Sequence, residues 1–502
     1  MENTIINKIA YTKNLSRQNF NILVNTPVDN NANIKTIINV NAYIYDKKIE
    51  TANNKAIVSG KIGVKVLYID TDNIFSTLTD SQSFSETIAD TSITSDSYIN
   101  LVNENLVCEV LSFDGVLKLN CSYSFNPVLY INIPMTELDC NCEGLMTKKC
   151  STQINSIANI IDTSFEYSCT LETKYNISKI LSYRSYFILT ESIACENSII
   201  VSGNIHSHLL FEVEEEGKPV LKTLTETNLV KTDIPTQNLT SEQILDLIYN
   251  IDQSKNEISS EIEDENSIIT INHTIKVTGL SIQPTTLELV DDMYSCNNEI
   301  NLNFAEREFN NNILLDTVEN YISGEISINE SELAIDSVVC NSNINSEIVN
   351  TYIKDGSVFI EGIISSQLVY VDENREYRLK NIEIPFILDT KSNKDVLETN
   401  KAELLVKECK TKVKRGTIVE FEYNVIINIT HYSSSKLKFI DNYTLGKSLD
   451  FSKYDYQIYL SKPNETIWEL SKRICITPED LCLYNKDLPS IMTGNEKIIV
   501  KR

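Results

Sequence analysis

A twelve-residue stretch that occurs three times constrains the fold of this chain more than any other feature. In each copy a glycine follows two apolar residues and one Ser or Glu, and an aromatic residue lies eight positions after the glycine. The copies are IVSGKIGVKVLY at Ile57–Tyr68, IVSGNIHSHLLF at Ile200–Phe211 and FIEGIISSQLVY at Phe359–Tyr370. The glycines are Gly60, Gly203 and Gly362, and they lie 143 and 159 residues apart. This spacing predicts three large repeats.

The pattern inside each copy is typical of a strand. Ile62, Val64 and Val66 alternate with other residues, which predicts a strand with one buried face. A glycine within such a strand indicates a β-bulge or the close approach of another backbone. A second alternating pattern follows 59, 68 and 59 residues after the three glycines, so we expect an insertion in the middle repeat. The centres of this second pattern are Leu119, Ile271 and Phe421.

Length and charge limit the classes of function. At 502 residues the chain is too long for one hydrophobic core. It has 44 basic and 70 acidic side chains, a net charge of −26, so its surface is expected to repel nucleic acids and anionic lipids. No apolar run approaches the ~20 residues that span a bilayer, and the first residues are too polar for a secretory signal. We therefore expect no nucleic-acid partner, no direct membrane insertion, and retention in the compartment of synthesis.

The cysteines and acidic turns give no metal or cofactor site. The chain has twelve cysteines and no CxxC motif, and only Cys140, Cys142 and Cys150 lie close together in sequence. No fourth zinc ligand occurs at a familiar spacing, so reduced, partly buried thiols are expected, and the role of these three cysteines stays open. The acidic residues Glu214–Glu216 predict a solvated turn rather than a cation site.

Two further local patterns lead to specific expectations. His206 and His208 lie two apart on a predicted strand and point the same way, but no third ligand accompanies them, so both are expected on an exposed face. The segment Thr240–Ile251 begins with a capping residue, Thr240 or Ser241, and its apolar residues fall on one helical face. It predicts a short amphipathic helix that packs on the middle repeat.

From Asp455 onward the pattern changes to strand, helix, helix, strand. Tyr456, Ile458 and Leu460 alternate as a first strand, and Lys497–Val500 reads as the last. Thr466 and Glu469 form a capping box before the first helix, and Thr477 with Pro478 opens the second. The second helix is expected to turn Leu481 and Tyr484 inward and to end at a left-handed Asn485.

This module resembles a LysM domain. The likeness rests on Asn464-Glu465-Thr466-Ile467-Trp468, which stands where the family has Gly-Asp-Thr-Leu-Trp, and on Leu470, Thr477, Leu481, Asn485 and Gly494 before KIIV. The family commonly binds N-acetylglucosamine polymers in a groove between two loops, which here would be Ser461–Thr466 and Leu488–Gly494. Asn464 and Glu465 depart from the family's Gly and Asp. A side chain at the glycine position puts glycan recognition in doubt.

Three β-rich repeats followed by a LysM-like module resemble the clostridial spore coat morphogenetic proteins that carry SPOCS domains. The resemblance implies a non-enzymatic scaffold that binds the coat-assembly ATPase, stage IV sporulation protein A, and other coat proteins. It also implies a location in the mother-cell cytoplasm, at the forespore surface and spore coat. The residues agree with a non-enzyme, since the sequence has no P-loop, no Gly-x-Ser-x-Gly and no His-Glu-x-x-His motif.

The expected fold class is mainly β and multidomain: three β-rich, SPOCS-like repeats followed by a small α+β (βααβ) LysM domain. The expected boundaries are an extension or leading strand at 1–18, repeats at 19–135, 154–286 and 303–432, linkers at 136–153, 287–302 and 433–452, and the LysM-like module at 453–502.

The expected partner-binding residues lie on one face of the LysM-like module. They are Asn464, Glu465, Thr466, Trp468, Arg473, Tyr484, Leu488 and Ile491, with Tyr459 as a further aromatic candidate. Trp468, the only tryptophan, has either a core or a contact role. The alternatives to a coat scaffold are a cortex peptidoglycan-binding module and a self-assembling shell or appendage protein. A wall-cleaving enzyme is disfavoured because no paired carboxylates are recognisable.

Overall fold

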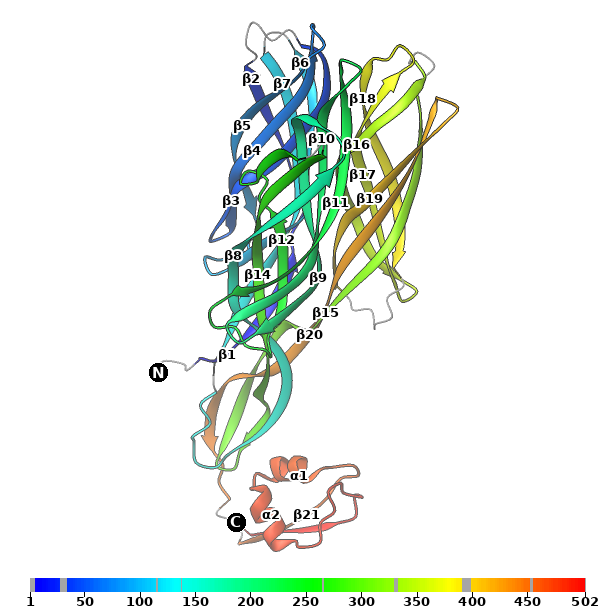
Figure 1. Ribbon diagram of the computed structural model, residues 1–502. Helices are drawn as coiled ribbons and strands as arrows, with labels where there is room; N and C mark the ends of the chain where they lie inside the picture. Colours follow the sequence, from blue (N-terminus) through cyan, green and yellow to red (C-terminus); the bar gives the residue numbers. More distant parts are fainter. Residues whose placement is uncertain are drawn as a thin grey trace.

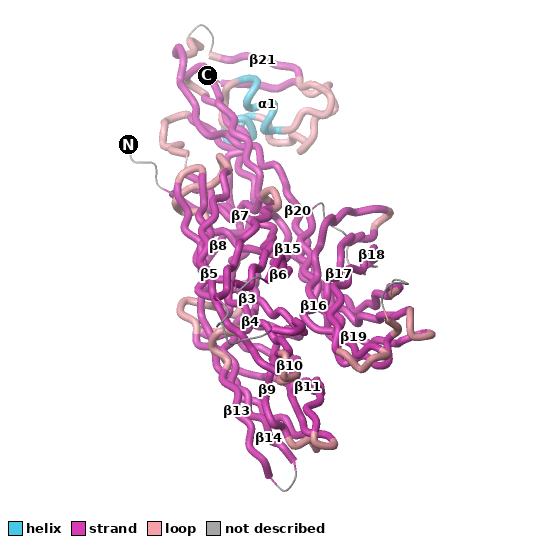
Figure 2. The backbone as a smooth tube through the Cα atoms, turned by 90° about the horizontal axis from the view of Figure 1, so that it is seen from above, coloured by secondary structure: helices cyan, strands magenta, loops and turns pink. Residues whose placement is uncertain are grey.

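The computed structural model describes residues 5–27, 34–113, 116–136, 138–263, 266–328, 333–390, 399–451 and 455–501. Within them the chain is mainly β, and the two helices both lie in the C-terminal module (Figure 2). The strands before this module form six sheets that pack in pairs as three sandwiches.

Sandwich 1 contains the first copy of the repeated stretch. One sheet is built around β7 (Val116–Thr136), which pairs with β1 (Ile5–Asn14), β2 (Gln18–Pro27) and β6 (Tyr98–Phe113). The other sheet is β3 (Ile34–Ala52), β4 (Lys55–Asp70) and β5 (Phe75–Ala89). The repeated stretch is the central strand, β4. The core lies between the sheets, where Val58, Val66 and Leu119 are fully buried.

Sandwiches 2 and 3 have a related order of strands. In sandwich 2, β14 (Asn266–Ser295) pairs with β8 (Leu145–Thr173), β12 (Ile244–Ile251) and β13 (Glu257–Glu263), opposite β9 (Ile177–Cys195), β10 (Ser198–Glu215) and β11 (Lys218–Pro235). In sandwich 3, β20 (Ile418–Ser448) pairs with β15 (Asn298–Ser327) and β19 (Thr399–Lys414), opposite β16 (Ile335–Lys354), β17 (Ser357–Asp372) and β18 (Tyr377–Thr390). The second and third copies are the central strands β10 and β17.

Each repeated glycine faces a β-bulge in the preceding strand. The register shifts at Tyr45/Lys48 in β3, at Leu189/Glu191 in β9 and at Ile348/Asn350 in β16, opposite the three glycines. A side chain would also meet its neighbours, since a Cβ at Gly203 would lie 2.6 Å from the Ile188 carbonyl oxygen. Both expected reasons for a glycine, a bulge and a close backbone approach, are therefore present.

The three sandwiches pack side by side and share apolar cores (Figure 1). One shared core joins the sheets that hold the repeated stretches, through Ile38, Leu210 and Val369. Farther along, the ends of the four longest strands, β8, β14, β15 and β20, form a segment that we call the stalk. Ile9, Leu289 and Phe439 contribute to a second shared core there. The C-terminal module lies beyond the end of this stalk (Figure 1).

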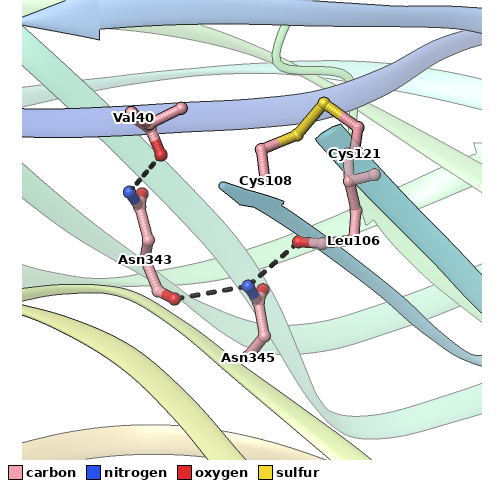
Figure 3. Close-up of a disulfide and its surroundings, with 6 residues drawn as sticks. All are labelled: Val40, Leu106, Cys108, Cys121, Asn343 and Asn345. Carbon is pink, nitrogen blue, oxygen red and sulfur yellow. Dashed lines mark hydrogen bonds between the residues drawn. A yellow bond between two sulfur atoms is a disulfide. The ribbon is translucent and has the colours of Figure 1, made fainter. Parts of the chain in front are cut away.

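Asparagines on β16 connect sandwich 3 to sandwich 1. Asn343 Nδ2 donates to the Val40 carbonyl at 2.6 Å, and Asn345 Nδ2 donates to the Leu106 carbonyl at 3.2 Å (Figure 3). These side-chain amides satisfy backbone acceptors across the interface, so the sandwiches are joined by polar as well as apolar contacts.

The segment 240–251 is not a helix, so that prediction is wrong. Thr240 begins a turn closed by Gln243 N–H at 3.2 Å, and β12 then pairs with β14 from Ile244 to Ile251. Ile248 packs toward sandwich 1, whereas Tyr249 packs into the core of sandwich 2. Burial on both faces favours the strand over the helix that the local spacing suggests. The insertion in the middle repeat includes the loop 252–256, which separates β12 from β13.

The expected linkers lie largely in strands. Residues 145–153 belong to β8, residues 433–448 to β20, and most of 287–302 to β14 and β15. These polar segments belong to the two long strand pairs of the stalk, β8 with β14 and β15 with β20, where one side of each strand faces solvent, so polarity does not mark a break in the sheet. The leading segment contains strand β1, which pairs with β7.

Two cysteines differ from the expectation of reduced thiols. Cys108 on β6 and Cys121 on β7 face each other in register and form a disulfide (Figure 3). Both side chains are buried in sandwich 1. Within the described residues, the other ten cysteines form no disulfide. Sequence spacing gave no reason to pair these two, because their proximity follows from the hairpin register.

The histidines are not on an exposed face, so that prediction is also wrong. His206 is 3% exposed, His208 is half-buried, and both lie where sandwich 2 packs against its neighbours, stacked on the Tyr186 ring. Tyr186 donates to the Lys407 carbonyl of sandwich 3 at 2.9 Å. The outer face of this sheet is covered by another sandwich, which a single strand pattern does not reveal.

We expect stability to fall between pH 7 and pH 5. Burial lowers the pKa of His206, His208 and His273 to about 4 from the usual 6.5. These histidines bind protons near pH 6.5 in the unfolded chain but not in the folded chain. Each of them therefore lowers the free energy of unfolding by up to about 1.4 kcal/mol for every unit by which the pH falls across this window. Urea midpoints at pH 7.5 and 5.5 measure the loss. A double variant, His206→Gln with His208→Gln, should show a shallower dependence, and a midpoint independent of pH would refute the expectation.

Candidate partner-binding site in the C-terminal module

The C-terminal module folds around two short helices and a two-stranded sheet. Its elements are β21 (Tyr456–Leu460), α1 (Ile467–Ile474), α2 (Pro478–Tyr484) and β22 (Lys497–Lys501). β21 and β22 pair antiparallel. Leu470, Leu481 and Val500 are fully buried in the module's core. The element order is the expected strand, helix, helix, strand.

Local capping signals position the helices. The capping box of Thr466 and Glu469 is confirmed, and so is Thr477 as the N-cap before Pro478. Asn485 is not left-handed, with φ −134°. Its side-chain amide instead donates to the Leu481 carbonyl at 2.9 Å and to the Ile499 carbonyl at 2.8 Å. This side chain therefore connects the end of α2 to β22.

The two loops expected to form a glycan groove are hydrogen-bonded to each other. Asn464 N–H donates to the Met492 carbonyl at 2.9 Å, and Met492 N–H donates to the Glu465 carbonyl at 2.8 Å. Asn464 has φ +64°, a left-handed conformation that Asn tolerates better than most residues other than glycine.

Glu465 and Arg473 are engaged with each other. The Arg473 guanidinium donates twice to the Glu465 carboxylate, at 2.6 and 2.8 Å, and Lys462 N–H donates to the same carboxylate at 2.9 Å. Arg473 holds the pKa of the Glu465 carboxyl below its ordinary value. A bidentate pair of this kind fixes the loop to α1, so both residues have a structural role within the module.

Trp468 packs against the stalk. Its Nε1–H donates to Asp292 Oδ2 at 2.8 Å, and its ring meets the Tyr294 ring edge-on at 5.0 Å between centroids. Tyr294 donates its hydroxyl to the Ile476 carbonyl at 2.7 Å, and Lys472 pairs with Asp292 at 2.5 Å. Partial burial raises the pKa of Asp292, but the hydrogen bonds from Lys472 and Trp468 outweigh it and hold that pKa below its ordinary value. This tryptophan joins the module to β14.

Removing the Asp292 carboxylate should loosen this junction. Trp468 is the only tryptophan, so its fluorescence reports on the contact alone. We expect Asp292→Ala to shift the emission to longer wavelength and to increase quenching by acrylamide. The reason is that the indole N–H loses its hydrogen-bond acceptor and the ring becomes more exposed to water. Asp291→Ala is the matched control, since Asp291 is exposed next to it. Identical spectra for the two variants would show that the contact does not form in solution.

An exposed apolar face lies on the other side of the module. Register places Ile458 opposite Ile499, and Tyr456 and Leu460 flank Ile458 on the same side of β21. Their exposed fractions are 62% for Tyr456, 71% for Ile458, 62% for Leu460 and 45% for Ile499. Lys497 and Lys501 are exposed on the same side of β22. We call these six residues the β21–β22 face. Clustered exposed apolar side chains mark interaction surfaces.

Some of the predicted partner-binding residues are exposed, whereas others make contacts within the protein. Asn464, Tyr484 and Ile491 are exposed, and Leu488 is half-buried. Glu465, Thr466, Trp468 and Arg473 have internal contacts, and Tyr459 packs on the module's core. Tyr484 is 41% exposed, contrary to the expectation that it faces inward. The alternation of Tyr456, Ile458 and Leu460 predicted the strand but did not tell which side of it is exposed.

The described residues offer no metal site and no membrane-spanning helix. No three of their His, Cys, Asp or Glu side chains are arranged to hold a metal ion. Cys142 lies in a loop beside the Tyr443 hydroxyl at 3.4 Å, and Cys150 lies within β8. In this part of the chain, neither helix is long and apolar enough to cross a bilayer.

The acidic segment Glu214–Glu216 leads into a turn. Glu216 and Gly217 form this tight turn between β10 and β11, and both have positive φ.

Comparison with known families relates part of the chain to sporulation. Residues 33–111 match the SipL, SPOCS domain family. The matched SPOCS segment includes β3, β4 with Gly60, β5 and most of β6. No curated protein and no solved structure gave a match. The SPOCS part of the resemblance is thereby supported, and the match suggests a sporulation-related protein.

Proposed function

We propose that this chain is a non-enzymatic scaffold of spore coat assembly that holds a protein partner through its C-terminal, LysM-like module. The partner is the coat-assembly ATPase, stage IV sporulation protein A, and the site of action is the forespore surface, from the mother-cell side. The exposed β21–β22 face is the observation that carries this proposal. The SPOCS match supports the link to sporulation.

Charge supports a contact made by the module rather than by the sandwiches. Residues 453–502 have eight basic and seven acidic side chains, whereas residues 1–452 have 36 basic and 63 acidic. The sandwiches are therefore strongly anionic and repel another acidic protein, while the near-neutral module presents apolar side chains beside Lys497 and Lys501. Such a face suits a partner with an apolar patch and an acidic rim.

The same geometry disfavours glycan binding as the function. The only tryptophan is directed at Asp292 and Tyr294 rather than at a groove. The position where the family has glycine carries the exposed Asn464 side chain.

Co-purification tests the proposal. The full-length chain should retain the coat-assembly ATPase on an affinity resin, and a chain ending at residue 451 should not. Equal retention of the ATPase by the shortened chain would overturn the assignment of the contact to the module. Muropeptide titration of the full-length chain, followed by Trp468 fluorescence, should show no saturable change.

A further inference from the structure

A large cavity lined by both polar and apolar residues lies where the three sandwiches meet. Its volume is about 1900 Å³, and strands of all three sandwiches line it, among them β3, β9 and β16. Nine of its lining residues are asparagines, including Asn41, Asn341 and Asn345. The asparagine amides in this lining offer both donors and acceptors, and the volume exceeds the ~300–1,000 Å³ typical of small-molecule sites.

Arg184 on β9 is a partly buried charged group in the lining of this cavity. Its Nη2 donates to Asn345 Oδ1 at 2.7 Å, and Asn345 in turn donates to the Leu106 carbonyl of sandwich 1 (Figure 3). Desolvation lowers the pKa of the Arg184 guanidinium, although the side chain keeps some accessible surface because it borders the cavity. The acceptor of the Arg184 hydrogen bond is thus the Asn345 side-chain amide, not a carboxylate.

No described carboxylate lies within 4.0 Å of this guanidinium, and several acidic residues of the lining have other partners. Asp162 pairs with Lys276 at 3.5 Å, and Asp252 pairs with Lys255 at 3.7 Å. The remaining pairs are Asp46 with Lys61, Glu104 with Lys47, and Glu408 with Lys410. A partly buried charge without a counter-ion is unfavourable, which favours the binding of an anion from solution.

The titratable residue opposite Arg184 in the ladder adds no negative charge. His208 lies opposite Arg184 in the ladder of β9 and β10. Burial, the Arg184 charge and His206 lower the pKa of His208 to about 4, so this imidazole is neutral at neutral pH. Its ring nitrogens contact the Thr225 and Tyr186 hydroxyls, at 3.1 and 3.2 Å.

We propose that this junction is an anion-binding site in which Arg184 holds a carboxylate- or phosphate-bearing small molecule. The planar guanidinium has five N–H donors, of which one is used by Asn345, and its fork matches both oxyanions. Since Asn345 also contacts sandwich 1, a bound anion would strengthen the connection between all three sandwiches. The site is independent of the module's partner contact.

Titration calorimetry of the full-length protein tests this site. Inorganic phosphate and succinate are titrated separately at constant ionic strength, and saturable one-site binding is expected for at least one of them, which tells phosphate from carboxylate. Arg184→Gln should weaken that binding at least tenfold, and Arg184→Lys, which keeps the charge but loses the fork, should weaken it less. Lys255→Gln removes a charge from the same cavity at a side chain that is 63% exposed, and should change nothing.

Two results would overturn the proposal. One is the absence of saturable heat from the wild-type protein with both anions, which needs no variant to interpret. The other is binding by folded Arg184→Gln, verified by circular dichroism, with the same affinity as Lys255→Gln.

Discussion

Gly362→Ala should destabilise the protein by about 3 kcal/mol, a large effect for the addition of one methyl group. The added Cβ would overlap the Glu347 carbonyl oxygen and the Phe386 ring. A ring can turn aside, but the carbonyl belongs to the bulged strand β16 and is held by the ladder with β17. The urea midpoint followed by far-ultraviolet circular dichroism measures the change.

Gly60→Ala is the matched control at the corresponding position of sandwich 1. Its Cβ would lie 3.1 Å from the Phe84 ring and 3.3 Å from the nearest backbone oxygen, that of Tyr45. Since the ring can yield and alanine restricts the unfolded chain, this variant should stay within about 1 kcal/mol of wild type. Equal midpoints for the two variants would refute the argument that the backbone approach demands glycine at Gly362.

Ile458→Asp should weaken binding of the coat-assembly ATPase by about thirtyfold, corresponding to roughly 2 kcal/mol. Ile458 is 71% exposed at the centre of the β21–β22 face, opposite Ile499, so a carboxylate there removes apolar contact and adds a desolvation cost. Because the side chain is outside the module's core, the fold should be retained. Surface plasmon resonance with the full-length chain gives the affinity.

Leu483→Asp controls for a new charge on the same module. Leu483 is 60% exposed on α2, outside the β21–β22 face, so this variant should bind as wild type. Unchanged fluorescence of Trp468 in both variants would show that the junction with the stalk is intact. Loss of affinity in both would mean that charge, and not this face, controls binding.

The sequence predicted what local patterns determine. Alternation identified β4 and β7 as strands, and the Thr466–Glu469 pair identified the start of α1, because these signals depend on neighbouring residues only. The glycine positions predicted bulges for the same reason.

What the sequence missed depends on contacts between distant segments. The segment of β12 has helical spacing, yet it is buried on two sides by different sandwiches and is a strand. His206 was expected in solvent because the sheet that covers it begins far along the chain. The sequence made Trp468 a binding candidate because its hydrogen-bond acceptor, Asp292, lies 176 residues earlier in the chain. The β21–β22 face escaped notice since alternation does not tell which side of a strand is covered.

Hydrogen exchange of the full-length chain, with and without the coat-assembly ATPase, tests the central proposal most directly. We predict slower exchange in the complex at residues 456–460 and 497–501, with the three sandwiches unchanged. Protection confined to the sandwiches, with β21 and β22 exchanging as in the free chain, would contradict a scaffold that grips its partner through the C-terminal module.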